Sequence, residues 1–124
     1  MKMIIAGGRK YQFTDKDYAE LDKIHKIISV TEVVSGKAKG ADTCGEVWAK
    51  KNGIKVADFP AEWTKFGKAA GPIRNLEMAK YADALAVSSG NDGTSNMVKN
   101  AKKEGLEIFY LSSFWDSEAS KVEE

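Results

Sequence analysis

The stretch KMIIAGG, residues 2–8, decides the fold, because a short apolar run ends abruptly in two glycines. Apolar runs bounded by turn residues are typical of buried strands. Four further runs share this pattern, at residues 32–35, 55–59, 84–88 and 107–111. The sequence therefore predicts five short buried strands.

Segments with helical periodicity separate the strands. Apolar residues recur at spacings of three and four around residues 18–28, 41–49 and 97–101, and a fourth helix is expected over 68–81. Alternating strands and helices favour a parallel sheet with right-handed crossovers. We therefore expect an α/β fold, a Rossmann-like three-layer sandwich whose five-stranded parallel sheet has the order 3-2-1-4-5 and helices on both faces.

Length and composition restrict the class of protein. The chain has 124 residues, of which 43% are hydrophobic and 30% charged, so we expect one globular domain over residues 1–124. Its last part, 113–124, is expected to be a docking tail that frays beyond Phe114 and Trp115. Nineteen basic against eighteen acidic residues give a net charge of +1, so nucleic acid is not expected as a partner.

The sequence gives little indication of a membrane span, a metal site or a disulfide. No apolar run approaches the roughly 20 residues of a membrane span, so we expect no membrane partner. Cys44 is the only cysteine and is expected to be inert packing in a cytoplasmic protein. His25 is the only histidine and is expected at the surface. We predict no metal and no cofactor.

Glycines cluster where ligands bind in folds of this kind. Open parallel sheets bind ligands outside the carboxyl ends of their strands, at the point where the strand order reverses, here between the first and fourth strands. Glycine there lets backbone N–H groups approach an anion. Six glycines follow strands one, two and four: Gly7, Gly8, Gly36, Gly40, Gly90 and Gly93. In contrast, Gly53 and Gly105 are expected to be left-handed helix ends.

Two of these loops carry polar side chains that suit phosphate. In SGNDGTS, residues 89–95, either Thr94 or Ser95 contacts phosphate or caps the next helix. In SGKAKGAD, residues 35–42, Ser35 and Lys39 are assigned to an anion site, and one of the loop's two lysines is expected to be only solvated. Asp42 either caps the following helix or holds a ribose hydroxyl.

Further candidates lie outside these loops. Arg74 shares a helix face with Gly71, Asn75 and Met78, and its fork suits phosphate, although a solvated face is the alternative. The opposite face is expected to meet the core through Ala69, Ile73 and Leu76. After the first strand, Arg9 either meets phosphate or pairs with an acid. After the third strand, Trp63 either stacks on a base or is buried or part of an interface.

Five ordered motifs within residues 3–101 resemble the YspA-type, cpYpsA-related branch of the SLOG superfamily. They are Gly-Gly-Arg (7–9), Ser-Gly-x-Ala-x-Gly-Ala-Asp (35–42), Pro-Ala-Glu-Trp (60–63), Gly-Pro-Ile-Arg-Asn-x-x-Met (71–78) and Gly-x-x-Gly-Thr-x-x-Met (90–97). The resemblance implies a Rossmann-like domain that binds a nucleotide or nucleotide-derived ligand, and it makes a homodimer possible.

The wider superfamily includes the LOG-type phosphoribohydrolases, to which parts of these motifs are similar. The resemblance aligns Arg74 with their arginine, and Gly90, Gly93 and Thr94 with their phosphate loop. Their glutamate is replaced by Met97, which cannot stabilise positive charge on ribose. A hydrolase would need another acid, with Asp42, Glu62 and Glu77 as the candidates.

Three functions follow as expectations. The first is a sensor or capture domain for a nucleotide-like small molecule. The second is an N-glycosidic hydrolase of nucleoside 5′-monophosphates, in which Arg74 orients the phosphate. The third is a protein that processes single-stranded nucleic acid, because the superfamily also resembles DNA-processing proteins, and the net charge makes it the weakest.

Overall fold

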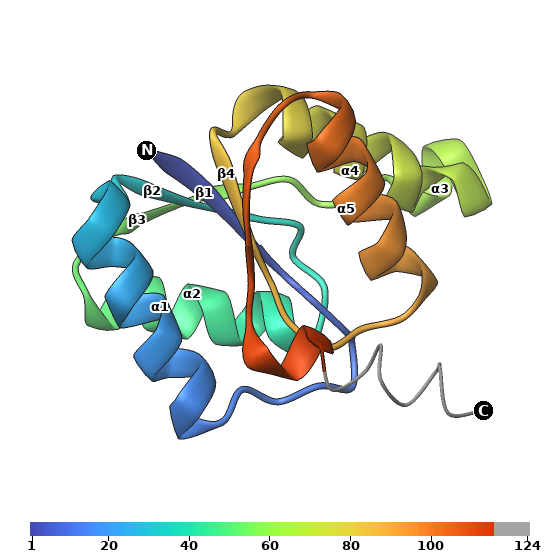
Figure 1. The fold of residues 1–124 in the computed structure, drawn as a ribbon. Coiled ribbons are helices and arrows are strands. Elements are labelled where there is room, and N and C mark those ends of the chain that lie inside the picture. Colours follow the sequence, from blue (N-terminus) through green and yellow to red (C-terminus); the bar gives the residue numbers. More distant parts are fainter. Residues whose placement is uncertain (116–124) are drawn as a thin grey trace.

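Five parallel strands form the sheet of the computed structural model, which describes residues 1–115 (Figure 1). They are β1 (Lys2–Ala6), β2 (Glu32–Ser35), β3 (Lys55–Asp58), β4 (Ala84–Val87) and β5 (Glu107–Tyr110). The strand order is β3-β2-β1-β4-β5 and every neighbouring pair is parallel. This confirms the expected fold class and strand order.

Helices cover both faces of the sheet, as Figure 1 shows. They are α1 (Asp15–Ile28), α2 (Ala41–Lys51), the single turns α3 (Trp63–Phe66) and η1 (Gly67–Ala69), α4 (Ala70–Tyr81) and α5 (Asp92–Lys103). Alternate residues of β1 point to opposite faces, so Met3 packs with α1 and α2 while Ile4 packs with α4 and α5. The sheet thus lies between two apolar cores. Because all its strands are parallel, their carboxyl ends lie along one edge of the sheet.

The face of α4 that meets the core differs from the expected one. Ala69 precedes the helix and is exposed, and Ile73 and Leu76 are only half-buried. The buried face instead contains Asn75 and Met78, together with Gly71 and two alanines. Small residues let α4 lie close to its neighbours, so the face expected to hold a ligand is also the face that packs inward.

Several smaller expectations can be compared with the structure. Gly53 and Gly105 have φ of 67° and 75°, which confirms them as left-handed helix ends. Cys44 is buried, as expected of a packing residue. His25, in contrast, is not a surface residue, so that expectation is wrong. The His25 ring is half-buried because its Nδ1 accepts a hydrogen bond from the Val30 amide (3.0 Å) and its edge meets the Trp48 ring.

The described part of the expected tail packs on the sheet edge. The rings of Phe114 and Trp115 lie 4.8 and 4.9 Å from the Tyr110 ring, and Trp115 remains 56% exposed. The rest of that segment, 116–124, lies outside the described residues. Within residues 1–115, none of the helices combines the length and apolar character needed to cross a membrane.

Candidate functional site

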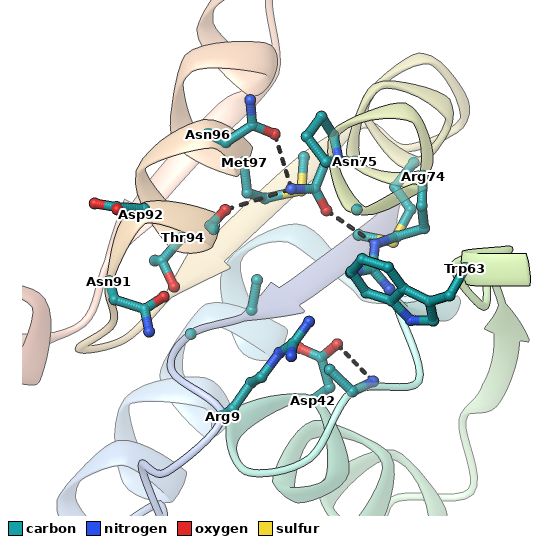
Figure 2. A pocket seen from close by; sticks show the side chains of 17 residues that line it. Arg9, Asp42, Trp63, Arg74, Asn75, Asn91, Asp92, Thr94, Asn96 and Met97 are labelled. Atoms are coloured by element: carbon teal, nitrogen blue, oxygen red, sulfur yellow. Dashed lines mark hydrogen bonds between the residues drawn. The ribbon is translucent and has the colours of Figure 1, made fainter. Parts of the chain in front are cut away.

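A cavity of about 300 Å³ opens outside the carboxyl ends of β1 and β4, which pair from Met3↔Ala84 to Ala6↔Val87. The chain leaves these strands in opposite directions, so no crossover covers the crevice between them. Figure 2 shows side chains that converge on it from the β1 and β2 loops, from α3 and α4, and from the start of α5.

The structure brings most of the candidate residues to this crevice. A neighbouring cavity of about 440 Å³ lies on the β2 side and shares Arg9, Trp63 and Arg74 with the first. The first cavity is also lined by Gly7, Asp42, Asn75, Gly93 and Thr94, and the second by Gly36 and Lys39. Gly8 and Gly90 line a third hollow beside the β1 loop. Ser35, Gly40 and Ser95 line none of these three hollows.

Arg74 is held across the crevice rather than on a solvated face. Its Nη1 donates to the Gly36 carbonyl, and its Nε donates to Asn75 Oδ1 at 3.0 Å. Burial lowers the pKa of Arg74, while the nearby Asp42 carboxylate opposes that shift. The guanidinium is thus a preorganised, half-buried cation between α4 and the β2 loop.

Asn75 is fully engaged with the protein. Its Nδ2 donates to Asn96 Oδ1 (2.9 Å) and to the Gly93 carbonyl (3.3 Å), and its Oδ1 receives the Arg74 bond. The side chain is buried. Asn75 therefore ties α4 to the first turn of α5 and orients Arg74, a role that residue type and helical spacing alone did not reveal.

Asp42 is not the cap of α2, so that interpretation of the sequence is wrong. The cap residue is Gly40, and no side chain bonds there. Asp42 instead accepts a hydrogen bond from the Ala38 amide at 3.2 Å and faces Arg9 in Figure 2. Burial raises the pKa of Asp42, against the lowering influence of the Ala38 amide, Arg74 and Arg9. A desolvated carboxyl thus sits beside two arginines.

Arg9 and Trp63 form an accessible cationic and aromatic pair. The Arg9 Cζ lies 5.5 Å from the Trp63 ring centre, within the range of a cation–π contact. Trp63 is 48% exposed and stands on the single turn α3, where it borders both cavities. Its ring is therefore available to a planar ligand.

The glycines mainly let loops approach one another. Gly40 has φ of 72°, and a Cβ there would lie 2.4 Å from the Gly8 carbonyl oxygen. A Cβ on Gly36 would lie 2.7 Å from Arg74 Nη1. Likewise, a Cβ on Gly90 would lie 2.0 Å from Thr94 Oγ1. Backbone packing therefore requires glycine at position 40, whereas a Cβ at position 36 or 90 would have to displace the side chains of Arg74 and Asp42 or of Thr94.

The start of α5 also departs from expectation. Its cap residue is Asn91, without a side-chain bond, so neither Thr94 nor Ser95 caps the helix. Thr94 is buried and Ser95 is exposed. Sequence reasoning missed Asn91, Asp92 and Asn96 as lining residues. Asn96 follows Gly93 by one helical turn, a spacing that would have placed it on the same face.

The acids proposed to replace the absent glutamate separate into two groups. Met97 lines the first cavity, where the hydrolases' glutamate was expected to align, and Asp42 lines it as well. Glu62 and Glu77 line a different hollow, next to Phe59. In the part of the chain from 1 to 115, no group of three or more His, Cys, Asp or Glu side chains is placed to hold a metal ion.

Ser35 points away from the crevice. Its hydroxyl donates to Glu46 Oε2 (2.6 Å) and accepts from the Lys37 amide (3.1 Å). Lys37 Nζ lies 2.8 Å from Glu46 and 3.8 Å from Asp58. Burial would raise the pKa of Glu46, but the bonds from Lys37 and Ser35 outweigh it and lower that pKa. Lys37 thus serves the loop's own structure.

Fold and crevice define an open α/β protein of the Rossmann-like class with a polar site at the sheet switch point. The chain belongs to the YspA, cpYpsA-related SLOG family, whose model matches residues 1–66. It is 32% identical over 116 residues to the Gene 61 protein of Mycobacterium phage D29, a match that covers 86% of this chain and 93% of that protein.

A solved structure supports the fold independently. The DNA processing protein A (DprA) of Streptococcus pneumoniae superposes with a TM-score of 0.71 at 19% sequence identity. The match covers 98% of this chain but 56% of the other, so this chain spans little more than half the length of DprA. At this identity, the likeness establishes the shared fold.

Proposed function

We propose that the protein binds a nucleotide or nucleotide-derived ligand in the crevice, as a sensor or capture domain. The observation that carries the proposal is the arrangement of Arg9, Trp63 and Arg74. Trp63 is exposed with the Arg9 guanidinium over its ring, and Arg74 borders the same two cavities at the carboxyl ends of a parallel sheet. A base stacks on such a ring, and guanidinium groups match phosphate oxygens. The family assignment agrees with this chemistry.

A thermal-shift screen tests the proposal with nucleoside mono-, di- and triphosphates, cyclic nucleotides, NAD and ADP-ribose. A ligand at a hundred times its Kd adds about 2.7 kcal/mol, which raises the Tm of a domain of this size by about 10 °C. We expect a selective shift that Arg74→Ala and Trp63→Ala both reduce. No shift with any compound would exclude the small-nucleotide function.

A hydrolase is the second candidate, and the position of Asp42 favours it. Asp42 is a buried carboxyl beside Arg74 in the cavity, so it is the one acid named from the sequence that could act at a ribose. Release of free base from a bound nucleoside monophosphate, abolished in Asp42→Asn while binding persists, would identify a hydrolase. Binding without release would leave the sensor function.

Nucleic acid is the third candidate. The matched solved structure is described as a DNA processing protein, so the expectation that nucleic acid is no partner lacks support. Binding of single-stranded DNA, measured at several salt concentrations, gives a slope that counts the phosphates contacted. A slope of zero, or no binding at low salt, would exclude this candidate.

A further inference from the structure

The two cavities of the crevice differ in charge. We propose that the ligand places its phosphates in the 440 Å³ cavity beside the β2 loop and its nucleoside part in the 300 Å³ cavity between α4 and α5. This rests on the proposed function and reverses the orientation expected from the glycine motif of the β4 loop.

The 300 Å³ cavity does not favour a dianion. Arg9 and Arg74 border it, but so do Asp42 and Asp92. The Asp92 carboxylate turns outward in Figure 2, yet it places negative charge on the first turn of α5, where a phosphate would have to bind. Uncharged groups supply most of the remaining lining, among them Met78, Met97, Pro72 and three asparagines. Such a surface suits a base and a sugar.

The loop at residues 90–94 is also closed on itself. The Thr94 side chain is buried and occupies the space beside Gly90 that a Cβ would fill. The Gly93 carbonyl accepts a bond from Asn75, which turns an acceptor rather than a donor toward α4. The space beside Gly90 is thus already filled, and a phosphate here would have only the uncapped first-turn amides of α5, next to the Asp92 carboxylate.

The 440 Å³ cavity is cationic. Four basic residues line it, Arg9, Lys37, Lys39 and Arg74, and no carboxylate does. Glu46 and Asp58 neutralise Lys37 from outside the lining. Lys39 is exposed and makes no ion pair within residues 1–115. Asp42 lies beside Arg9 and Arg74 but lines only the other cavity, so it offsets part of their charge, and Lys39 and the two arginines still leave this cavity with an excess of positive charge for the phosphates of a ligand.

The shared wall explains how one ligand reaches both cavities. Arg9, Trp63 and Arg74 border each of them, so a molecule that stacks along Trp63 continues from one cavity into the other. The ligand class is accordingly a nucleoside diphosphate or a related polyphosphate. We expect affinity to increase from adenosine to AMP to ADP.

Titrations of ¹⁵N-labelled protein with adenosine, AMP, ADP and pyrophosphate test the orientation. We expect pyrophosphate to shift the amide signals of residues 36–40 and to leave those of 91–95 in place. Lys39→Gln should weaken ADP binding about tenfold and leave adenosine binding unchanged, because it removes one charge-assisted contact. Lys103→Gln, an exposed lysine in the last turn of α5, is the matched control.

The alternative outcomes are distinct. If Thr94→Val removes the gain from adenosine to ADP, and the shifts fall on 91–95, the orientation is wrong while the proposed function stands. The orientation is also wrong if neither variant changes that gain. If adenosine, AMP and ADP all fail to bind, the ligand class and orientation inferred here are wrong, whereas the proposed function fails only if the whole thermal-shift panel also gives no shift.

Discussion

The loops after β2 and β4 carry the same glycine signal but have different structures. The β2 loop has two residues with positive φ, Lys37 at 61° and Gly40 at 72°, and the Ala41 amide binds it to the Gly8 carbonyl. The β4 loop meets α4 through Asn75 and closes on Thr94. Glycine spacing therefore shows where backbone segments approach closely, whereas the surrounding charges decide what each loop can bind.

The substitution with the largest expected effect disrupts the conformation of the β2 loop. Gly40→Ala forces a Cβ against the backbone of Gly8 and Arg9 at a left-handed position, so we expect a loss of about 3 kcal/mol or more in the free energy of unfolding. Thermal denaturation should show a Tm lower by about 12 °C. Gly53→Ala is the matched control, because Gly53 also has positive φ but has open space around it.

That control separates steric contact from backbone strain. Gly53→Ala should cost about 1 kcal/mol, the ordinary penalty of alanine in a left-handed conformation. Equal losses in the two variants would show that the β1 and β2 loops move apart to accommodate the added methyl group at no further cost.

The substitution with the next largest effect weakens the contact between α4 and the start of α5, on the β4 side of the crevice. Asn75→Leu removes the bonds to the Gly93 carbonyl, to Asn96 Oδ1 and from Arg74 Nε, although Asn96 keeps its bond from Asn100 and Arg74 keeps its bond to Gly36, so we expect a loss of about 2 to 3 kcal/mol by urea denaturation. Asn100→Leu is the control, since its Nδ2 bonds only to Asn96, one turn away on α5. A similar loss in both variants would contradict the linking role of Asn75.

A smaller effect distinguishes two acids near the β2 loop by pH. Burial raises the folded pKa of Asp42, so wild-type stability falls as pH rises from the unfolded pKa through the folded one. The folded pKa of Glu46 is lowered, because the bonds from Lys37 and Ser35 outweigh burial, so its contribution is present above the unfolded pKa and is lost on acidification.

Urea denaturation between pH 3 and pH 7 should therefore give opposite trends. Relative to wild type, Asp42→Asn should gain stability as pH rises. Glu46→Gln should lose stability over the same range, and by a small amount because Lys37 is exposed. Parallel trends would show that burial does not dominate the titration of Asp42.

The smallest effect concerns Ser95. Its side chain is exposed and caps no helix, so Ser95→Ala should change the free energy of unfolding by less than about 0.5 kcal/mol and leave ligand binding unchanged. Isothermal titration with ADP measures the second quantity. A marked loss of affinity would indicate that the phosphate binds at the β4 loop.

The sequence by itself determined the architecture. Buried runs such as KMIIAGG, the helical stripes between them and the glycines after the strands are local patterns, and each follows from backbone geometry and apolar burial. Strand order and the location of the crevice followed, because few connections of this kind are possible.

Only the tertiary structure decided what each polar side chain does. Ser35 turns to Glu46, Asn75 bridges two helices, and Asp42 bonds to its own loop, because hydrogen-bond partners come from segments 4 to 21 positions away. Residue type shows which bonds a side chain can make. Which bond forms depends on the distances and burial that the packed sheet and helices impose.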